Sequence, residues 1–278
     1  MANHPQPSSE PLLRAVELQK SYGRSAFWSG RTRDFKALDG VSLSITSGSC
    51  TALIGESGSG KSTLAACLAR LEDADQGEVW FEGTNLSRLS GQTLRSARAR
   101  FQLIFQDASA ALNPGFTAAE LVEEPLVIQK IGNRGEQRGR AREILQRLGI
   151  PEARHQCRSQ EFSGGQRKRI ALARALVLRP RLLILDEVLS GLDLLIAAQI
   201  LKQLMELRAE QGLALLFASH DLNLLARTVD SIAVMQHGQI VEQGSTPDLF
   251  NRPQHPYTRS LISAYEQLQD TRARGAGR

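Results

Sequence analysis

The fold of this chain is decided by the stretch Gly55-Glu56-Ser57-Gly58-Ser59-Gly60-Lys61-Ser62. It reads G-x-x-x-x-G-K-S, between an apolar run at residues 50–54, typical of a buried strand, and a helix-like segment at residues 63–69. Strand, glycine-rich loop and helix in this order predict a phosphate-binding loop. The glycines let successive backbone N–H groups curl toward one anion, and the start of the helix adds a partial positive charge there. We therefore expect a bound nucleotide triphosphate, with Lys61 reaching its β- and γ-phosphates and Ser62 binding Mg²⁺.

Composition places few limits on function. The chain has 278 residues, of which 41% are hydrophobic and 23% charged, and its net charge is +5. No apolar run approaches the roughly 18 residues that span a bilayer. The polar segment 1–11 is expected to be a disordered lead rather than a secretory signal, so we expect a cytoplasmic location. Basic charge fits an anionic partner, lipid or nucleic acid, and equally a basic surface with no special role.

Hydrophobic patterning divides the rest of the chain. Alternating runs within residues 12–45 predict antiparallel strands, and the arginine-rich segment 24–36 between them predicts a solvated hairpin loop, with a partner or membrane contact as the alternative. Residues 106–158 have a helical pattern. Buried strands are expected at 182–185 and 213–218, a helix at 194–210, and a hairpin turning at His237-Gly238. Cys50 and Cys67 are expected in the core, and the basic residues 270–278 in a disordered tail.

Two carboxylates follow the apolar run 182–185. Asp186 and Glu187 would then lie at the carboxyl edge of a parallel sheet, where ligands bind. Asp186 is expected to hold Mg²⁺ through water, and Glu187 to polarise the water that attacks the γ-phosphorus. The alternative is a pair of carboxylates that only face solvent.

A second glycine-rich motif reads Phe162-Ser163-Gly164-Gly165-Gln166 and precedes a helical run. A serine hydroxyl and glycine N–H groups at a helix start form an anion site. With this motif the sequence resembles the nucleotide-binding subunit of an ATP-binding-cassette (ABC) transporter, whose signature is L-S-G-G-Q. The resemblance implies a head-to-tail dimer with each ATP between one subunit's phosphate loop and the other's signature.

The remaining family motifs follow in order. Tyr22 resembles the aromatic residue that stacks on adenine, and Gln106 the glutamine that senses Mg²⁺ and water while its loop touches the membrane subunit. Ser190-Gly191-Leu192-Asp193 resembles the loop that crosses to the partner site, and His220 the switch histidine at the γ-phosphate. The site residues implied are, for nucleotide, Tyr22, Gly55, Glu56, Ser57, Gly58, Ser59, Gly60, Lys61, Ser62, Thr63, Ser163, Gly164, Gly165 and Gln166; for catalysis, Lys61, Gln106, Glu187 and His220; for Mg²⁺, Ser62, Gln106 and Asp186.

The resemblance also implies a fold class and domain boundaries. We expect an α/β P-loop NTPase (RecA-like) core with a parallel sheet, an N-terminal antiparallel β subdomain and a helical insertion subdomain. The ATP-binding core with its antiparallel part would comprise residues 12–106 and 168–247, the helical and signature part 107–167, and a C-terminal tail 248–278. Phe162, Val188 and Gly191 depart from the usual family residues, so an ATPase that binds ATP but hydrolyses it slowly beside a more active partner stays open.

Two further stretches indicate the branch of the family. Asp107-Ala108-Ser109-Ala110-Ala111-Leu112-Asn113-Pro114 and His255-Pro256-Tyr257-Thr258-Arg259 resemble ATPases of the oligopeptide, dipeptide and nickel uptake group. Residues 186–194 look closest to the nickel-type second ATPase. This implies an ATP- and Mg²⁺-dependent importer subunit for nickel, or alternatively for di- or oligopeptides, on the cytoplasmic face of the membrane. Its partners would be a homologous ATPase subunit, two permease subunits and, indirectly, a solute-binding protein, but no nucleic acid. A soluble cassette ATPase acting on ribosomes or DNA is the alternative of a different class.

Overall fold

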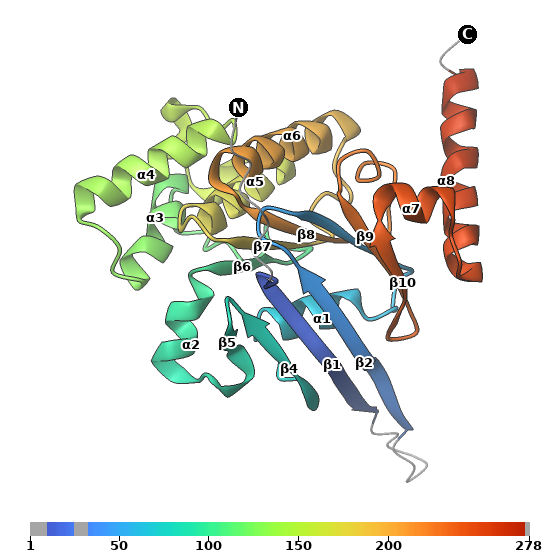
Figure 1. Cartoon of the computed structure of the whole chain (residues 1–278). Helices are drawn as coiled ribbons and strands as arrows, with labels where there is room; N and C mark the ends of the chain where they lie inside the picture. The colour runs from blue at the N-terminus through green and yellow to red at the C-terminus, as the bar shows by residue number, and fades with distance from the viewer. Residues whose placement is uncertain (1–9, 25–32, 276–278) are drawn as a thin grey trace, which may run out of the picture.

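The computed structural model describes residues 10–24 and 33–275 (Figure 1). The lead expected at residues 1–9 and the centre of the basic hairpin segment, residues 25–32, lie outside the described residues. Among the described residues no helix combines the length and the hydrophobicity that a bilayer crossing requires.

A six-stranded sheet forms the centre, in the order β10-β9-β3-β8-β7-β6. Five neighbouring strands run parallel, and β10 returns antiparallel on β9. The strands β3 and β7 are buried at every position, which matches their continuous apolar sequence. The strands are β3 (Cys50–Ile54), β6 (Phe101–Ile104), β7 (Leu182–Asp186), β8 (Ala214–Ser219), β9 (Ser231–Gln236) and β10 (Gln239–Ser245).

A second, antiparallel sheet has the order β2-β1-β4-β5. Its strands are β1 (Leu13–Arg24), β2 (Arg33–Ile45), β4 (Gln76–Phe81) and β5 (Thr84–Asn85). The helix α1 (Lys61–Leu68) buries Leu64 and Leu68 in a core shared by both sheets. The predicted antiparallel strands at residues 12–45 are therefore confirmed, and the second sheet covers the helix that starts at the phosphate loop.

Further helices lie on the opposite side of the central sheet (Figure 1). They are α3 (Ala118–Ile128), α4 (Arg134–Arg147), α5 (Gly164–Leu176) and α6 (Leu194–Gln211), while the short α2 (Gly91–Arg98) precedes β6. The helices α5 and α6 cover the face of the sheet, and α3 and α4 pack against α5. The expected fold class, a parallel-sheet core with an antiparallel β part and a helical insertion, is confirmed. The boundaries at 106/107 and 167/168 stay predictions; α5 runs through the second of them.

The C-terminal part corrects one expectation. After α7 (Thr246–Asn251), the helix α8 (Pro256–Gly275) continues through residues 270–275, where we expected a disordered tail. These residues read D-T-R-A-R-G, and no helix breaker precedes the final glycine, so basic composition alone was a poor guide. The rings of Phe250 and Tyr265 pack edge to face at 5.4 Å and join α8 to α7.

The two cysteines expected in the core lie there. Cys50 and Cys67 are both buried. Burial raises the pKa of Cys50 to about 12 and the pKa of Cys67 to about 11. Both thiols therefore stay protonated near neutral pH and behave as small apolar core groups.

Candidate nucleotide-binding site

The phosphate loop joins β3 to α1 and is packed too closely for side chains at two glycines. A Cβ on Gly55 would lie 2.1 Å from the carbonyl oxygen of Met235 in β9. Gly60 has φ 106°, and a Cβ there would lie 2.3 Å from the carbonyl oxygen of Ala37 in β2. Both glycines are thus required by the close approach of two neighbouring strands.

Lys61 lies almost fully buried inside the loop, with 4% of its surface exposed. Its Nζ donates to the carbonyl oxygens of Gly55 and Glu56, both at 2.7 Å, and to the Ser59 hydroxyl at 3.4 Å. Burial lowers the pKa of Lys61, and the nearby carboxylates of Glu187 and Asp186 oppose that shift. The ammonium group is therefore held in a frame of oxygen acceptors at the point where the loop turns into α1.

Asp186 ends β7 with 3% of its surface exposed, and its Oδ1 is buried with no hydrogen-bond partner. Burial raises the pKa of Asp186, and a hydrogen bond from Ser62 opposes the rise. No cluster of three or more His, Cys, Asp or Glu residues that could hold a metal occurs in the described part of the chain. A buried carboxylate oxygen beside a serine hydroxyl is nevertheless a fitting partial ligand set for Mg²⁺, which completes its shell with water and nucleotide phosphates.

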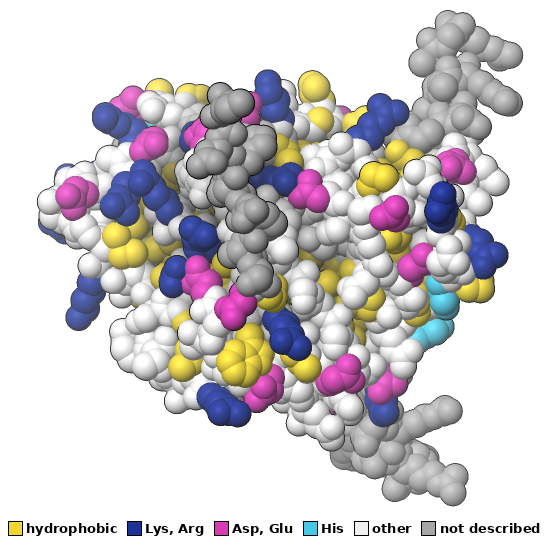
Figure 2. Space-filling view, in the orientation of Figure 1, with side chains coloured by type: hydrophobic (Ala, Val, Ile, Leu, Met, Phe, Trp, Pro, Cys, Tyr) yellow, Lys and Arg dark blue, Asp and Glu magenta, His cyan; other side chains and the backbone are white. Residues whose placement is uncertain are grey.

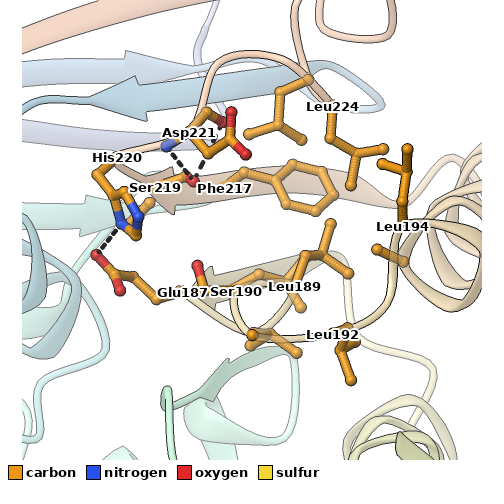
Figure 3. Close-up of a pocket in the computed structure, with 16 residues that line it drawn as sticks. Glu187, Leu189, Ser190, Leu192, Leu194, Phe217, Ser219, His220, Asp221 and Leu224 are labelled. Atoms are coloured by element: carbon orange, nitrogen blue, oxygen red, sulfur yellow. Dashed lines mark hydrogen bonds and ion pairs between the residues drawn. The ribbon is translucent and has the colours of Figure 1, made fainter.

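Glu187 and His220 meet across the ends of β7 and β8 (Figure 3). The backbone of Glu187 has φ 50°, and its N–H donates to the carbonyl oxygen of Ala218 at 2.9 Å. Its Oε1 lies 3.0 Å from Nδ1 of His220. The two residues are 33 positions apart in sequence, and the neighbouring parallel strands bring them together as expected from strand-end placement.

A cleft of about 300 Å³ gathers half of the predicted site residues. It is lined by Tyr22, Phe35, Ala37, Ser57, Gly58, Gly60, Lys61, Ser62, Thr63, Gln106 and Glu187. Tyr22 donates its hydroxyl hydrogen to the carboxylate of Glu72, and its ring is 38% exposed. Burial, together with this bond, raises the pKa of Tyr22.

Phe35 is a second exposed aromatic ring in this cleft, and the sequence analysis did not assign it to the site. It lies on β2 directly opposite Tyr22 on β1. The sequence analysis placed Phe35 in the loop 24–36, whereas β2 already begins at Arg33 and pairs Phe35 with Tyr22 on one face of the sheet.

The residues Ser163, Gly164, Gly165 and Gln166 are absent from the lining of the cleft, although they are partly or fully exposed. The Ser163 hydroxyl caps α5 by accepting the backbone N–H of Gln166 at 3.3 Å. The side-chain Oε1 of Gln166 in turn accepts the backbone N–H of Ser163 at 3.1 Å. The structure therefore places the signature motif as a preformed helix start outside the cleft that holds Lys61.

Phe162, the residue that replaces the usual leucine of the signature, is buried with 3% exposed surface. The guanidinium of Arg154 lies 4.5 Å from the centre of its ring, a cation–π geometry. Arg154 also donates to the carbonyl oxygen of Glu161 at 2.7 Å and to the side chain of Gln166 at 3.3 Å. Arg154 therefore holds the signature through Phe162, Glu161 and Gln166, a contact that the sequence analysis did not predict.

A second hollow, of about 320 Å³, adjoins Glu187 and His220 (Figure 3). Its walls are mainly apolar and come from the loop after β7, from β8 and from the segment after β8, including Leu189, Leu192, Phe217 and Leu224. Val188 contributes to it and is 2% exposed. Val188, one of the departures from the usual family residues, is therefore a core residue.

The comparisons with known proteins agree with this arrangement. A family model described as "ABC transporter" matches residues 38–190, and one described as "Oligopeptide/dipeptide transporter, C-terminal region" matches residues 241–277. A putative peptide import ATP-binding protein of Brucella ovis is 42% identical over 91% of this chain and 78% of that protein. The glutathione import ATP-binding protein GsiA of Pectobacterium atrosepticum is 41% identical over 92% of this chain, which spans only 41% of that protein.

A solved structure of similar fold is the dimeric post-hydrolysis state of the ATP-binding cassette MJ0796 bound to ADP and Pi. It matches with a TM-score of 0.76 and 28% identity over 84% of this chain and 98% of that chain. Fold and site together define a nucleotide-binding cassette. The chain belongs to the ABC transporter family, and it is an ATPase.

Proposed function

We propose that this ATPase powers a membrane importer for di- or oligopeptides. The observation that carries the proposal is the C-terminal region at residues 241–277, which is similar to that of oligopeptide and dipeptide transporters. The relatives named for peptide and glutathione import support the same substrate class. Our first expectation, nickel, rested on residues 186–194 and has no support in these comparisons.

In this proposal the cleft binds ATP in a defined direction. Tyr22 and Phe35 receive the adenine, because aromatic faces stack on any base. The backbone N–H groups of the loop 55–63 surround the phosphates, and Lys61 turns from its carbonyl acceptors to the β- and γ-phosphates. Ser62, Asp186 and Gln106 hold Mg²⁺, which supplies charge neutralisation on the transferred phosphoryl group.

Two further side chains act at the γ-phosphate. Glu187 accepts a proton from the attacking water, and its fixed backbone and its contact with His220 keep the carboxylate pointed into the site. His220 stabilises the closed geometry. The position of both groups at the strand ends, 3.0 Å apart, supports a joint role.

The signature motif completes a different ATP site, that of a second cassette. This follows from its position outside the cleft of Lys61 and from its preformed helix start, which presents N–H groups to an anion. The relative MJ0796 is a dimer with ADP and Pi bound. We propose that a homologous subunit, or a second copy, closes on this chain when ATP is bound and opens after hydrolysis.

Membrane subunits are proposed to dock at an apolar groove of about 330 Å³ beside Gln106. It lies between the end of β6 and the helices α3 and α5, and it exposes Phe105 at 47% and Ile128 at 53%. Large exposed apolar side chains that line a groove mark a protein contact. Gln106 follows Phe105 directly, so a permease seated there would reach the ATP site. Figure 2 shows acidic and basic side chains interspersed over the face in view.

The test is uptake in a strain that lacks this gene and is complemented with the wild type or with Lys61→Ala. We expect the wild type to restore uptake of labelled di- and tripeptides and the variant to fail. Restored nickel uptake with unchanged peptide uptake would contradict the peptide proposal and return the substrate to nickel. Normal uptake of both solutes in the deletion strain would contradict the transport role itself.

A further inference from the structure

The motif His255-Pro256-Tyr257-Thr258-Arg259 has no part in the site described so far, although its side chains are firmly placed. It begins α8, 200 residues after the phosphate loop. The carboxylate of Glu242 on β10 accepts the backbone N–H groups of Gln254 at 2.8 Å and His255 at 2.9 Å. The start of α8 is thereby attached to the edge of the central sheet (Figure 1).

The first turn of α8 is fixed from within as well. Nδ1 of His255 accepts the N–H of Tyr257 at 3.2 Å, and Arg259 donates to the carbonyl oxygen of Gln254 at 2.7 Å. Thr258 is completely buried. The Tyr257 side chain therefore leaves a rigid base and is itself half-buried against the core.

From this base the hydroxyl of Tyr257 reaches the phosphate loop. It accepts the backbone N–H of Glu56 at 3.0 Å. That N–H belongs to the same planar peptide group as the carbonyl of Gly55, because a peptide bond joins the two residues. The Gly55 carbonyl in turn accepts Nζ of Lys61 at 2.7 Å. One peptide group is thus held between Tyr257 on its N–H and Lys61 on its carbonyl.

We propose that Tyr257 is a positioning residue for the ATP site: it fixes the Gly55–Glu56 peptide group and, through it, the entrance of the phosphate loop and the resting place of Lys61. The inference rests on the proposed roles of Lys61 and the loop. The C-terminal segment thereby determines how well the phosphate loop is preorganised before ATP binds. A preorganised loop binds ATP more tightly, because a loose loop would have to be ordered on binding.

Tyr257→Phe tests this with the smallest change, since it removes the accepting oxygen and keeps the ring. Tyr265→Phe is the matched control: it makes the same change on the same helix, and the Tyr265 ring packs on Phe250. A neutral hydrogen bond is worth a factor of about 2 to 10 in an equilibrium constant. We expect Tyr257→Phe to raise the KM for ATP by that factor with little change in kcat, and Tyr265→Phe to leave both constants unchanged.

Backbone hydrogen exchange gives a second readout that does not depend on turnover. In Tyr257→Phe the peptide covering residues 55–59 should exchange faster without nucleotide, while peptides from β7 and β8 should not change. An unchanged KM, an unchanged exchange rate of the loop, or a loss of kcat and thermal stability at constant KM would each overturn the proposal. Lys61→Ala distinguishes a failure of the proposed ATP site from a failure of the role of Tyr257. If it leaves ATP affinity intact, the proposed site is wrong; if it weakens ATP binding and Tyr257→Phe does not, only the role of Tyr257 fails.

Discussion

Replacement of Glu187 by glutamine separates chemistry from architecture at this site. The side chain keeps its shape, and the amide can still contact Nδ1 of His220, 3.0 Å from Oε1 in the wild type. The backbone stays fixed by the bond from the Glu187 N–H to Ala218. The negative charge of the carboxylate is lost, and with it the basicity. A general base contributes a factor of about 10² to 10⁴, so the barrier should rise by about 3 to 5 kcal/mol.

The assay is steady-state phosphate release at saturating ATP and Mg²⁺, together with equilibrium ATP binding. The control is Glu206→Gln on α6, an exposed glutamate that lies 3.9 Å from Lys202. We expect the control to hydrolyse ATP like the wild type and Glu187→Gln to bind ATP normally while turnover is almost lost. Turnover within a factor of about 10 of the wild type would refute the reasoning, since that lies below the range for a lost general base.

Three further changes test other parts of the site. Gly55→Ala should destabilise the protein by about 1 to 3 kcal/mol in thermal melts, because its Cβ would lie 2.1 Å from the Met235 carbonyl oxygen; an unchanged melting temperature would show that the loop is not packed as described. Arg154→Ala should cost about 1 to 2 kcal/mol of stability through the lost contacts with Phe162, and it should lower ATPase activity of the assembled dimer without weakening ATP binding by the single chain. Burial raises the pKa of Asp186. Its carboxyl group therefore stabilises the metal-free fold below the ordinary carboxyl pKa, and this stabilisation is lost as the pH rises through the raised value. Asp186→Asn should therefore raise the melting temperature in EDTA at neutral pH and end Mg²⁺-dependent hydrolysis; a lower melting temperature would contradict this sign.

Much of the fold and of the cleft could be predicted because local patterns determine them. The buried strands β3 and β7 are continuous apolar runs, and each ends at a motif whose chemistry is local. Parallel strands of one sheet end at the same edge, and β8 alone separates β3 from β7, which is why Lys61, Asp186 and Glu187 could be grouped from the sequence. Their grouping depends only on strand order and direction.

The parts that escaped prediction depend on contacts between distant segments. Nothing near Tyr257 in sequence indicates that its hydroxyl meets Glu56, 201 positions away. The sequence showed Phe162 only as a departure from the family pattern, because its contact with Arg154 depends on the fold. The helix at residues 270–275 was missed because charge was weighted above helix propensity.

The central claim, that this chain binds ATP in the cradle around Lys61, is tested most directly by equilibrium titration of the purified protein with ATP and Mg²⁺. The wild type should bind saturably, and Lys61→Ala should bind far more weakly while keeping the melting behaviour of a folded protein. Equal affinity of the two proteins, or no binding by the wild type, would contradict the account.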